Sequence, residues 1–189
     1  ISPFAFDLQD EATIEAAAQA IGPMDLTIIA TGMLHQATIQ PEKSLRALST
    51  DAFEQAFAIN TIGPALIGKH MLPHLPKDRR SVFAVLSARV GSISDNRLGG
   101  WHAYRASKAA LNMTVRNFAI EMARTHPQAI IVALHPGTVD TELSQPFQRG
   151  VAPEKLFTTD YAAERMLQVL GGLTPEDSGQ LFAWDGARI

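Results

Sequence analysis

The sequence contains no cysteine in its 189 residues, which excludes disulfide bonds, thiolate zinc sites and a cysteine nucleophile. No apolar run approaches the roughly 20 residues that a membrane-spanning helix requires. The opening residues ISPFAFDLQD have no basic start and become acidic at once, so they show no secretory signal. We therefore expect a soluble cytoplasmic protein without a membrane partner.

Three motifs of common enzyme classes are also missing. There is no GxSxG elbow of α/β-hydrolases, no GxxxxGK(S/T) phosphate loop and no HExxH zinc motif. The net charge is −3, which gives no reason to expect a nucleic-acid partner. Hydrophobic residues make up 46% and charged residues 19%, a balance typical of a folded globule. We expect a single domain and no metal site.

The sequence does contain a regular alternation of strand and helix patterns. The strand patterns are continuous apolar runs, so both faces of their sheet must be covered. This is typical of a three-layer α/β fold with a Rossmann-type, doubly wound parallel sheet. Asp10 is the expected N-cap of the first helix, and Ser49 or Thr50 that of the second. We expect strands at 3–6, 24–32, 81–88, 129–137 and 178–186, and helices at 10–21, 49–72, 102–125 and 158–172.

In such sheets ligands bind beyond the carboxyl ends of the strands, so the residues that follow each strand are the first candidates for a site. Glycine at these positions lets a ligand approach the backbone closely. A serine hydroxyl there can bond a substrate oxygen, or it can be satisfied by the backbone. The candidates are Asp7, Thr31–Gly32, Ser87, Pro136–Gly137 and Thr141.

Tyr104 and Lys108 lie four positions apart in WHAYRASKAAL, so on a helix they share one face. A phenol with a pKa of about 10 is a poor proton donor or acceptor at neutral pH. A lysine ammonium held nearby lowers that pKa, and the pair can then exchange a proton with an alcohol or carbonyl oxygen. The alternative is two polar side chains on the exposed face of an ordinary helix.

Asn60 lies in the middle of the second helix pattern, four positions before Pro64. A proline has no N–H, and its ring crowds the carbonyl four residues earlier. We expect a kink there, with the Asn60 carbonyl left to bind a water that connects Lys108 to solvent. The alternative is a hydrated kink on the solvent side.

These features, taken together in their order, resemble the short-chain dehydrogenase/reductase family over nearly the whole chain. SARVGSISDN, GGW and YRASKAALN further resemble its C-factor-like and carbonyl-reductase-like subgroup. The residues that carry the resemblance are Asp7 after a strand, ATG at 30–32, NTIG at 60–63, Ser87, YRASK at 104–108 and PGTVDT at 136–141.

The resemblance implies an oxidoreductase that binds NADP or NAD and exchanges hydride between the nicotinamide and a carbonyl or alcohol. It implies that Tyr104 is the general acid for reduction and the base for oxidation. Lys108 would lower the pKa of Tyr104 and hold the nicotinamide ribose, Asn60 would anchor a water relay, and Ser87 would bond the substrate. The subgroup favours NADP, although the sequence itself does not separate the two cofactors.

The resemblance also assigns the cofactor contacts and two larger segments. Residues 142–157 would form a mobile substrate lid. The two long helices, at about 50–72 and 102–125, would build a homodimer or homotetramer. The implied contacts are Asp7 and Leu8 with the adenine, Ala30, Thr31 and Gly32 near the ribose, and Pro136, Gly137, Thr138, Val139 and Thr141 at the carboxamide end.

Two departures from the family pattern stand out. The N-terminal strand and the TGxxxGxG pyrophosphate loop have no counterpart here, so we expect this chain to be part of a protein longer by roughly 50 residues, the size of a βαβ unit. The subgroup also has two adjacent serines where this chain has Ser87 and Ala88, and the catalytic one matches Ala88. Ser87 or Ser92 would have to replace it.

Two functions therefore remain open. The first is an NAD(P)-dependent carbonyl reductase or alcohol dehydrogenase, which Asn60, Tyr104 and Lys108 favour. The second is a non-catalytic nucleotide-binding or C-factor-like signalling protein on the same scaffold, which Ala88 and the absent phosphate loop favour. The sequence does not identify the substrate.

Overall fold

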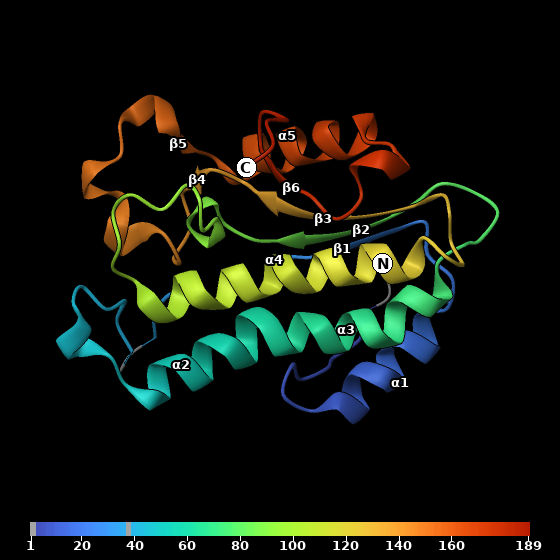
Figure 1. The fold of residues 1–189 in the computed structure, drawn as a ribbon, viewed down its shortest axis with the longest axis horizontal. Coiled ribbons are helices and arrows are strands. Elements are labelled where there is room, and N and C mark those ends of the chain that lie inside the picture. Colours follow the sequence, from blue (N-terminus) through green and yellow to red (C-terminus); the bar gives the residue numbers. More distant parts are fainter. Residues whose placement is uncertain (1–2, 37–38) are drawn as a thin grey trace.

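The computed structural model describes residues 3–36 and 39–189 as a three-layer α/β fold (Figure 1). Its main sheet has four parallel strands in the order β1-β2-β3-β6. Helices α1, α3 and α4 lie on one face of this sheet and α5 lies on the other (Figure 1). The elements are α1 (Glu11–Ile21), β1 (Leu26–Ile29), α2 (Thr50–Phe57), α3 (Gly63–Met71), β2 (Ser81–Leu86), α4 (His102–Met122), β3 (Ala129–His135), β4 (Thr138–Val139), β5 (Leu156–Phe157), α5 (Thr159–Gly172) and β6 (Leu181–Ala183).

The two central strands explain the continuous apolar runs of the sequence. Successive residues of β2 point to opposite faces, and each face has its own hydrophobic core. Phe83 and Val85 pack with α1, α3 and α4, whereas Val82 and Ala84 pack with residues of α5 such as Leu170. The expected parallel, doubly covered sheet is therefore confirmed.

The expected strand at 3–6 is wrong, because residues 3–7 have no regular structure. A strand needs a neighbour that supplies backbone hydrogen bonds, and within the described residues β1 pairs only with β2. Phe4 and Phe6 are 47% and 39% exposed, and Leu26 and Ile28 of β1 are 46% and 42% exposed. Leu26 and Ile28 alternate along the strand and so point to one face of the sheet, which is apolar and exposed at β1.

The expected long helix at 49–72 is divided by a π-helical turn at Ala58–Ile62. Ser49 caps α2 by accepting a hydrogen bond from the Ala52 N–H, as the sequence predicts. The Gly63 N–H reaches back to the Ala58 carbonyl, and Pro64 follows at the start of α3. Because Pro64 cannot donate to Asn60, the wider turn accommodates the disturbance that the sequence indicates.

Other predicted boundaries agree closely with the structure. Asp10 caps α1, and Thr158 caps α5.

The segment at 138–157 holds the short parallel pair β4–β5, with 3₁₀ turns at Gln145–Gly150 and Pro153–Lys155. Further 3₁₀ turns lie at Leu45–Ala47, Leu72–His74, Arg89–Gly91 and Pro175–Asp177. Across the described residues, each helix is too short or too polar to cross a membrane.

We predict that Phe83→Ala destabilises the protein by about 3–5 kcal/mol, because the ring is fully buried between the sheet and three helices. Chemical denaturation measures this as a fall in the free energy of unfolding. Leu98→Ala is the control, since that side chain is 91% exposed and its loss should change stability by less than about 0.5 kcal/mol. Equal losses in both variants would contradict the assignment of the core.

Candidate functional site

Tyr104 and Lys108 lie on the first turns of α4, at the carboxyl edge of the sheet. Lys108 Nζ is 6.0 Å from the centroid of the Tyr104 ring, so the two side chains share a face as the spacing predicts. The α4 helix follows Gly99 and Gly100, both with positive φ, and begins after Trp101. The pair is not on the exposed face of the helix, because Lys108 is only 3% exposed.

Burial sets the protonation of both side chains. It raises the pKa of Tyr104 to about 12 and lowers the pKa of Lys108 to about 8. Lys108 Nζ donates a hydrogen bond of 2.8 Å to the Leu86 carbonyl at the end of β2. Burial accounts for the raised pKa of Tyr104, and the expectation that Lys108 stabilises its phenolate remains a prediction.

Asn60 lies in the π turn with its side chain fully buried. Its Oδ1 accepts from the Met33 N–H and its Nδ2 donates to the Met33 carbonyl, both at 2.8 Å. Nδ2 also donates to Ser107 Oγ at 3.1 Å, and Thr61 Oγ1 donates to the Ser107 carbonyl. The amide therefore joins the loop after β1 to α4. The expected relay through the Asn60 carbonyl remains a prediction.

Gly32, Asn60 and Lys108 converge at the carboxyl end of β1. A Cβ placed on Gly32 would lie 3.6 Å from Lys108 Nζ and 3.7 Å from Asn60 Oδ1. Beside it, the buried Thr31 Oγ1 has no hydrogen-bond partner among the described residues. A buried hydroxyl without a partner and a glycine opening onto an ammonium fit a polar ligand such as a nucleotide ribose. Ala30 lies directly before them in the same loop.

Ser87 has a hydrogen-bond partner within the chain. Its hydroxyl donates to Asn112 Oδ1 at 2.6 Å, and the residue is 5% exposed. Asn112 Nδ2 in turn donates weakly to the Gly91 carbonyl at 3.4 Å. Ser92 Oγ lies 3.5 Å from Ser94 Oγ in the next loop. The Ser87 hydroxyl is therefore bonded to a side chain of α4, and its predicted bond to substrate stays a prediction.

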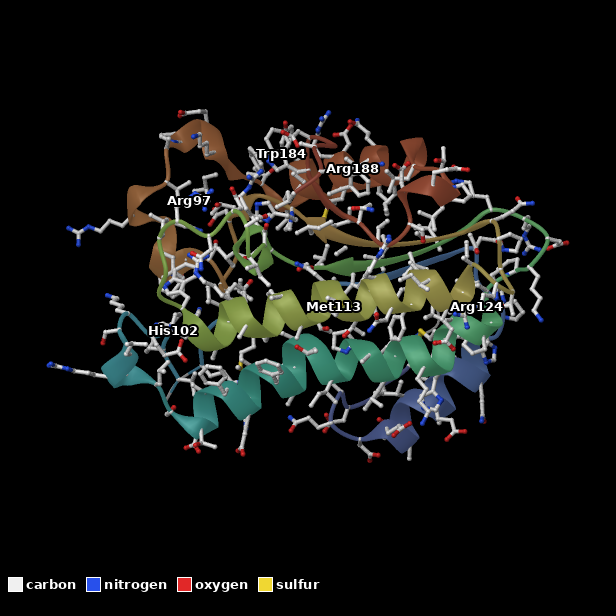
Figure 2. All side chains as sticks on the ribbon, viewed as in Figure 1. Arg97, His102, Met113, Arg124, Trp184 and Arg188 are labelled. Carbon is white, nitrogen blue, oxygen red and sulfur yellow. The ribbon has the colours of Figure 1, made fainter. Side chains whose placement is uncertain are left out.

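The turn after β3 lies beside Trp184, because a Cβ on Gly137 would be 3.1 Å from Trp184 Cδ1. Figure 2 shows Trp184 on the α5 side of the sheet and His102 on the α4 side. Gly137 has φ +82°, and a Cβ there would lie 2.5 Å from Phe157 Cε2. Only glycine fits between the turn and this aromatic ring. Burial and the nearby Arg89 lower the pKa of His135 to about 4, so its imidazole is neutral.

The other residues predicted to contact the cofactor lie at 136–141, after β3, and at positions 7 and 8, before α1. Pro136 and Gly137 lead into Thr138 and Val139, which form β4. Thr141 is exposed, and its Oγ1 donates to the Val139 carbonyl at 3.4 Å. Asp7 is exposed, and its carboxylate accepts from the Gln9 N–H at 2.9 Å. Leu8 packs against α3, where a Cβ on Gly63 would lie 3.1 Å from it.

The predicted lid is in contact with the start of α4. Phe147, in the 3₁₀ turn at Gln145–Gly150, meets Trp101 edge-on with ring centroids 5.0 Å apart, and His35 at 5.6 Å. The Trp101 and Tyr104 rings are 6.3 Å apart. The rings of His35, Phe147 and Trp101, from three distant segments, therefore pack in a row that ends beside Tyr104.

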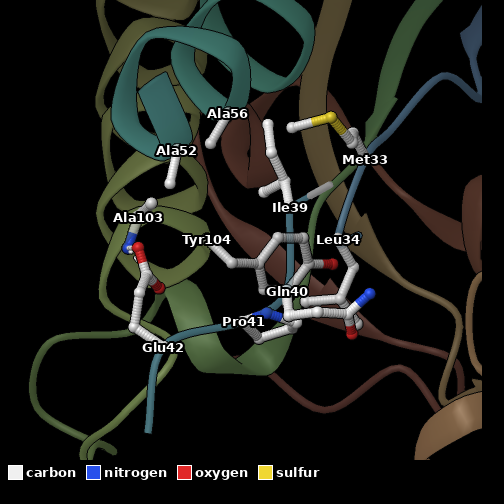
Figure 3. A pocket seen from close by; sticks show the side chains of 10 residues that line it. All are labelled: Met33, Leu34, Ile39, Gln40, Pro41, Glu42, Ala52, Ala56, Ala103 and Tyr104. Atoms are coloured by element: carbon white, nitrogen blue, oxygen red, sulfur yellow. Dashed lines mark hydrogen bonds between the residues drawn. The ribbon is translucent and has the colours of Figure 1, made fainter. Parts of the chain in front are cut away.

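A pocket beside Tyr104 holds a residue that sequence reasoning missed. Figure 3 shows Glu42 among the lining residues, next to Ala103 at the start of α4. Glu42 is 4% exposed, and its carboxylate accepts from the Ala103 N–H. Asn112 was missed as well, although it lies on the same helix face, four positions after Lys108.

Residues 3–36 and 39–189 contain no cluster of three acidic or histidine side chains that would hold a metal ion.

Comparison with known proteins agrees with this geometry. Residues 1–152 match the family profile described as short chain dehydrogenase. The C-signal protein of Myxococcus xanthus is 37% identical over 136 residues, covering 71% of this chain and 76% of that protein. The 1-hydroxy-2-glutathionyl-2-methyl-3-butene dehydrogenase of Rhodococcus sp. is 29% identical over 183 residues, covering 97% of this chain and 77% of that protein.

Solved structures show the same fold. An NADPH-bound carbonyl reductase from chicken fatty liver has a TM-score of 0.84 and 26% sequence identity, covering 98% of this chain and 75% of that one. The carbonyl reductase Sniffer of D. melanogaster has a TM-score of 0.82, with 21% identity over 97% of this chain and 75% of its own. The family match spans most of the sequence, and Tyr104, Lys108 and Asn60 occupy one edge of the sheet. The chain therefore belongs to the short-chain dehydrogenase family.

Proposed function

We propose that the protein is an NAD(P)-dependent oxidoreductase that exchanges hydride between the nicotinamide and a carbonyl or alcohol substrate. The observation that carries this proposal is the convergence of Gly32, Asn60 and Lys108 around one point, beside Tyr104. The resemblance to an NADPH-bound carbonyl reductase supports NADP over NAD and a carbonyl substrate.

The cofactor would be held mainly by the loops after β1 and β3. Thr31 and Gly32 offer an unpartnered buried hydroxyl and an open backbone, which suit the ribose next to Lys108. Pro136, Gly137, Thr138, Val139 and Thr141 would bind the carboxamide end, and Asp7 and Leu8 the adenine. When bound, the nicotinamide supplies the hydride that reduces the carbonyl carbon.

The protein supplies the proton that completes the alcohol. Tyr104 is neutral at physiological pH because its pKa is about 12, so its hydroxyl donates to the carbonyl oxygen as the hydride arrives. The charged form of Lys108 stabilises the phenolate that remains. A water relay anchored at Asn60 then returns a proton from solvent. In oxidation the same groups act in reverse.

A second candidate is a nucleotide-binding protein without catalysis. Ala88 stands where the subgroup has its substrate-binding serine, and the Ser87 hydroxyl already donates to Asn112. The 37% identity with C-signal is compatible with this alternative. This second candidate includes a C-factor-like signalling protein on the same scaffold. Only the first candidate requires turnover, and failure to bind NADH or NADPH would favour the second.

Oligomerisation through the long helices also remains a proposal. Ile62, Met113 and Ile120 on these helices are 52%, 62% and 49% exposed. Such side chains provide apolar surface for a homodimer or homotetramer.

We predict that Tyr104→Phe in the natural full-length protein lowers carbonyl reduction by at least about 100-fold, because the general acid is removed. Binding of NADPH, measured by fluorescence titration, should change less than about twofold. The matched control is Tyr161→Phe, which alters the other tyrosine and should leave turnover unchanged. Unchanged turnover in Tyr104→Phe would contradict the oxidoreductase. Binding without any turnover in the unaltered protein would favour the second candidate.

We predict that Ala88→Ser raises turnover roughly 5- to 100-fold, the value of one hydrogen bond made to substrate in the transition state. Steady-state kinetics of the two proteins measure the difference. Ser92→Ala serves as the comparison. If Ser92 already supplies the hydroxyl, its loss will lower turnover and Ala88→Ser will add nothing, which would refute this prediction.

We predict that kcat/KM for reduction falls as the pH rises through about 8. Burial lowers the pKa of Lys108 to about 8, so its ammonium is present below that pH and is lost above it. Tyr104 stays protonated over this range because its pKa is about 12. A pH–rate profile tests this, and a rate that remains flat to about pH 10 would show that the Lys108 charge is not required.

A further inference from the structure

The α4 helix, which carries Tyr104, begins without a cap of its own. Gly99, Gly100 and Trp101 have φ values of +61°, +67° and +50°, so three consecutive residues enter the helix in left-handed conformations. Trp101 occupies the N-cap position and makes no side-chain hydrogen bond there. By contrast Asp10, Ser49 and Thr158 cap α1, α2 and α5 with their own side chains.

Glu42 provides the missing acceptors from 61 positions earlier in the chain. Its two carboxylate oxygens lie 3.3 Å and 3.2 Å from the Ala103 nitrogen. Figure 3 shows the carboxylate beside Ala103. Its backbone carbonyl accepts from the Trp101 N–H at 2.5 Å. The backbone also passes close to Gly100, where a Cβ would lie 3.4 Å from the Glu42 carbonyl.

The Glu42 carboxylate and the first turn of α4 each supply a hydrogen-bonding partner that the other lacks. The first N–H groups of a helix lack partners within the helix, and the positive end of its dipole favours an anion. A carboxylate that is 4% exposed would be unfavourable without such partners. Glu42 and the start of α4 therefore stabilise each other. Tyr104 follows Ala103 directly, so the direction of its side chain depends on where this first turn is held.

We propose that Glu42 is a positioning residue that fixes the first turn of α4 and thereby aims the Tyr104 hydroxyl into the site. This inference rests on the proposed function, in which Tyr104 donates the proton. Glu42 itself contacts backbone groups and not the reacting atoms. Its contribution is to orientation, where small displacements of a catalytic group reduce rates strongly.

The kinetic test compares three variants of the natural full-length protein. Glu42→Ala removes the acceptor and should lower kcat roughly 10- to 100-fold, with KM for NADPH changed less than about twofold. Glu42→Gln retains an acceptor oxygen without the charge, so its loss should be smaller. Ser49→Ala is the matched control, because it removes a side-chain cap of similar length, 3.2 Å, at α2. It should lower the melting temperature similarly and leave kcat unchanged.

A spectroscopic test is independent of activity. Incorporation of meta-fluorotyrosine labels Tyr104 and Tyr161, the 2 tyrosines of this chain, and the fluorine NMR signal that disappears in Tyr104→Phe is the one from Tyr104. We expect Glu42→Ala to displace or broaden the Tyr104 signal, and Ser49→Ala to leave it in place. Both measurements are made at a temperature where each variant is folded.

The outcomes separate this inference from the proposed function. In a protein that turns over, an unchanged kcat or an unchanged Tyr104 signal in Glu42→Ala would overturn the positioning role. If the unaltered protein reduces no carbonyl, the oxidoreductase proposal fails, and the fluorine signal alone decides whether Glu42 places Tyr104. A fall in kcat equal to that of Ser49→Ala would also overturn it, since general loss of stability would then explain both.

Discussion

The site depends on the hydrogen bonds that the buried side chain of Asn60 makes. Its amide bonds both backbone groups of Met33 and the hydroxyl of Ser107, so one side chain ties the loop after β1 to the helix that carries Tyr104 and Lys108. In a low-dielectric interior such bonds are strong, and leaving any of these groups without a partner is costly. The π turn is what brings the amide to this position, because it changes the helical phase just before Pro64.

The same burial sets the electrostatics of the site. Removing water disfavours the charged form of an acid and of a base alike, so the pKa of Tyr104 rises while that of Lys108 falls. Tyr104 is thereby kept as a neutral phenol that retains its proton. Lys108 keeps its charge near neutral pH, with the Leu86 carbonyl as an acceptor. A phenol with a raised pKa gives up its proton less readily, so donation in the proposed reduction depends on the Lys108 ammonium to stabilise the phenolate.

Much of the fold and part of the site followed from the sequence. Continuous apolar runs predicted the buried parallel strands, and Asp10 and Ser49 marked the starts of two helices. The i, i+4 spacing predicted that Tyr104 and Lys108 share a face. The strand at 3–6 was wrong because an apolar pattern shows that a segment can pair, and pairing needs a neighbour that the described chain does not provide. The hydrogen bond between Ser87 and Asn112 was not predicted, because Asn112 lies on another element 25 positions later.

The sequence by itself determined the layered α/β fold, the family and the shared helix face of Tyr104 and Lys108, since these depend on periodicity and short motifs. Only the tertiary structure decided how the groups are held and charged. The Glu42 carboxylate reaches α4 from 61 positions away, and the pKa values of Tyr104 and Lys108 reflect burial by several segments. Helix and strand patterns arise from neighbouring residues. A helix cap supplied by a distant segment, and the burial that shifts a pKa, depend on residues that come together only in the folded protein. No local sequence pattern predicts them.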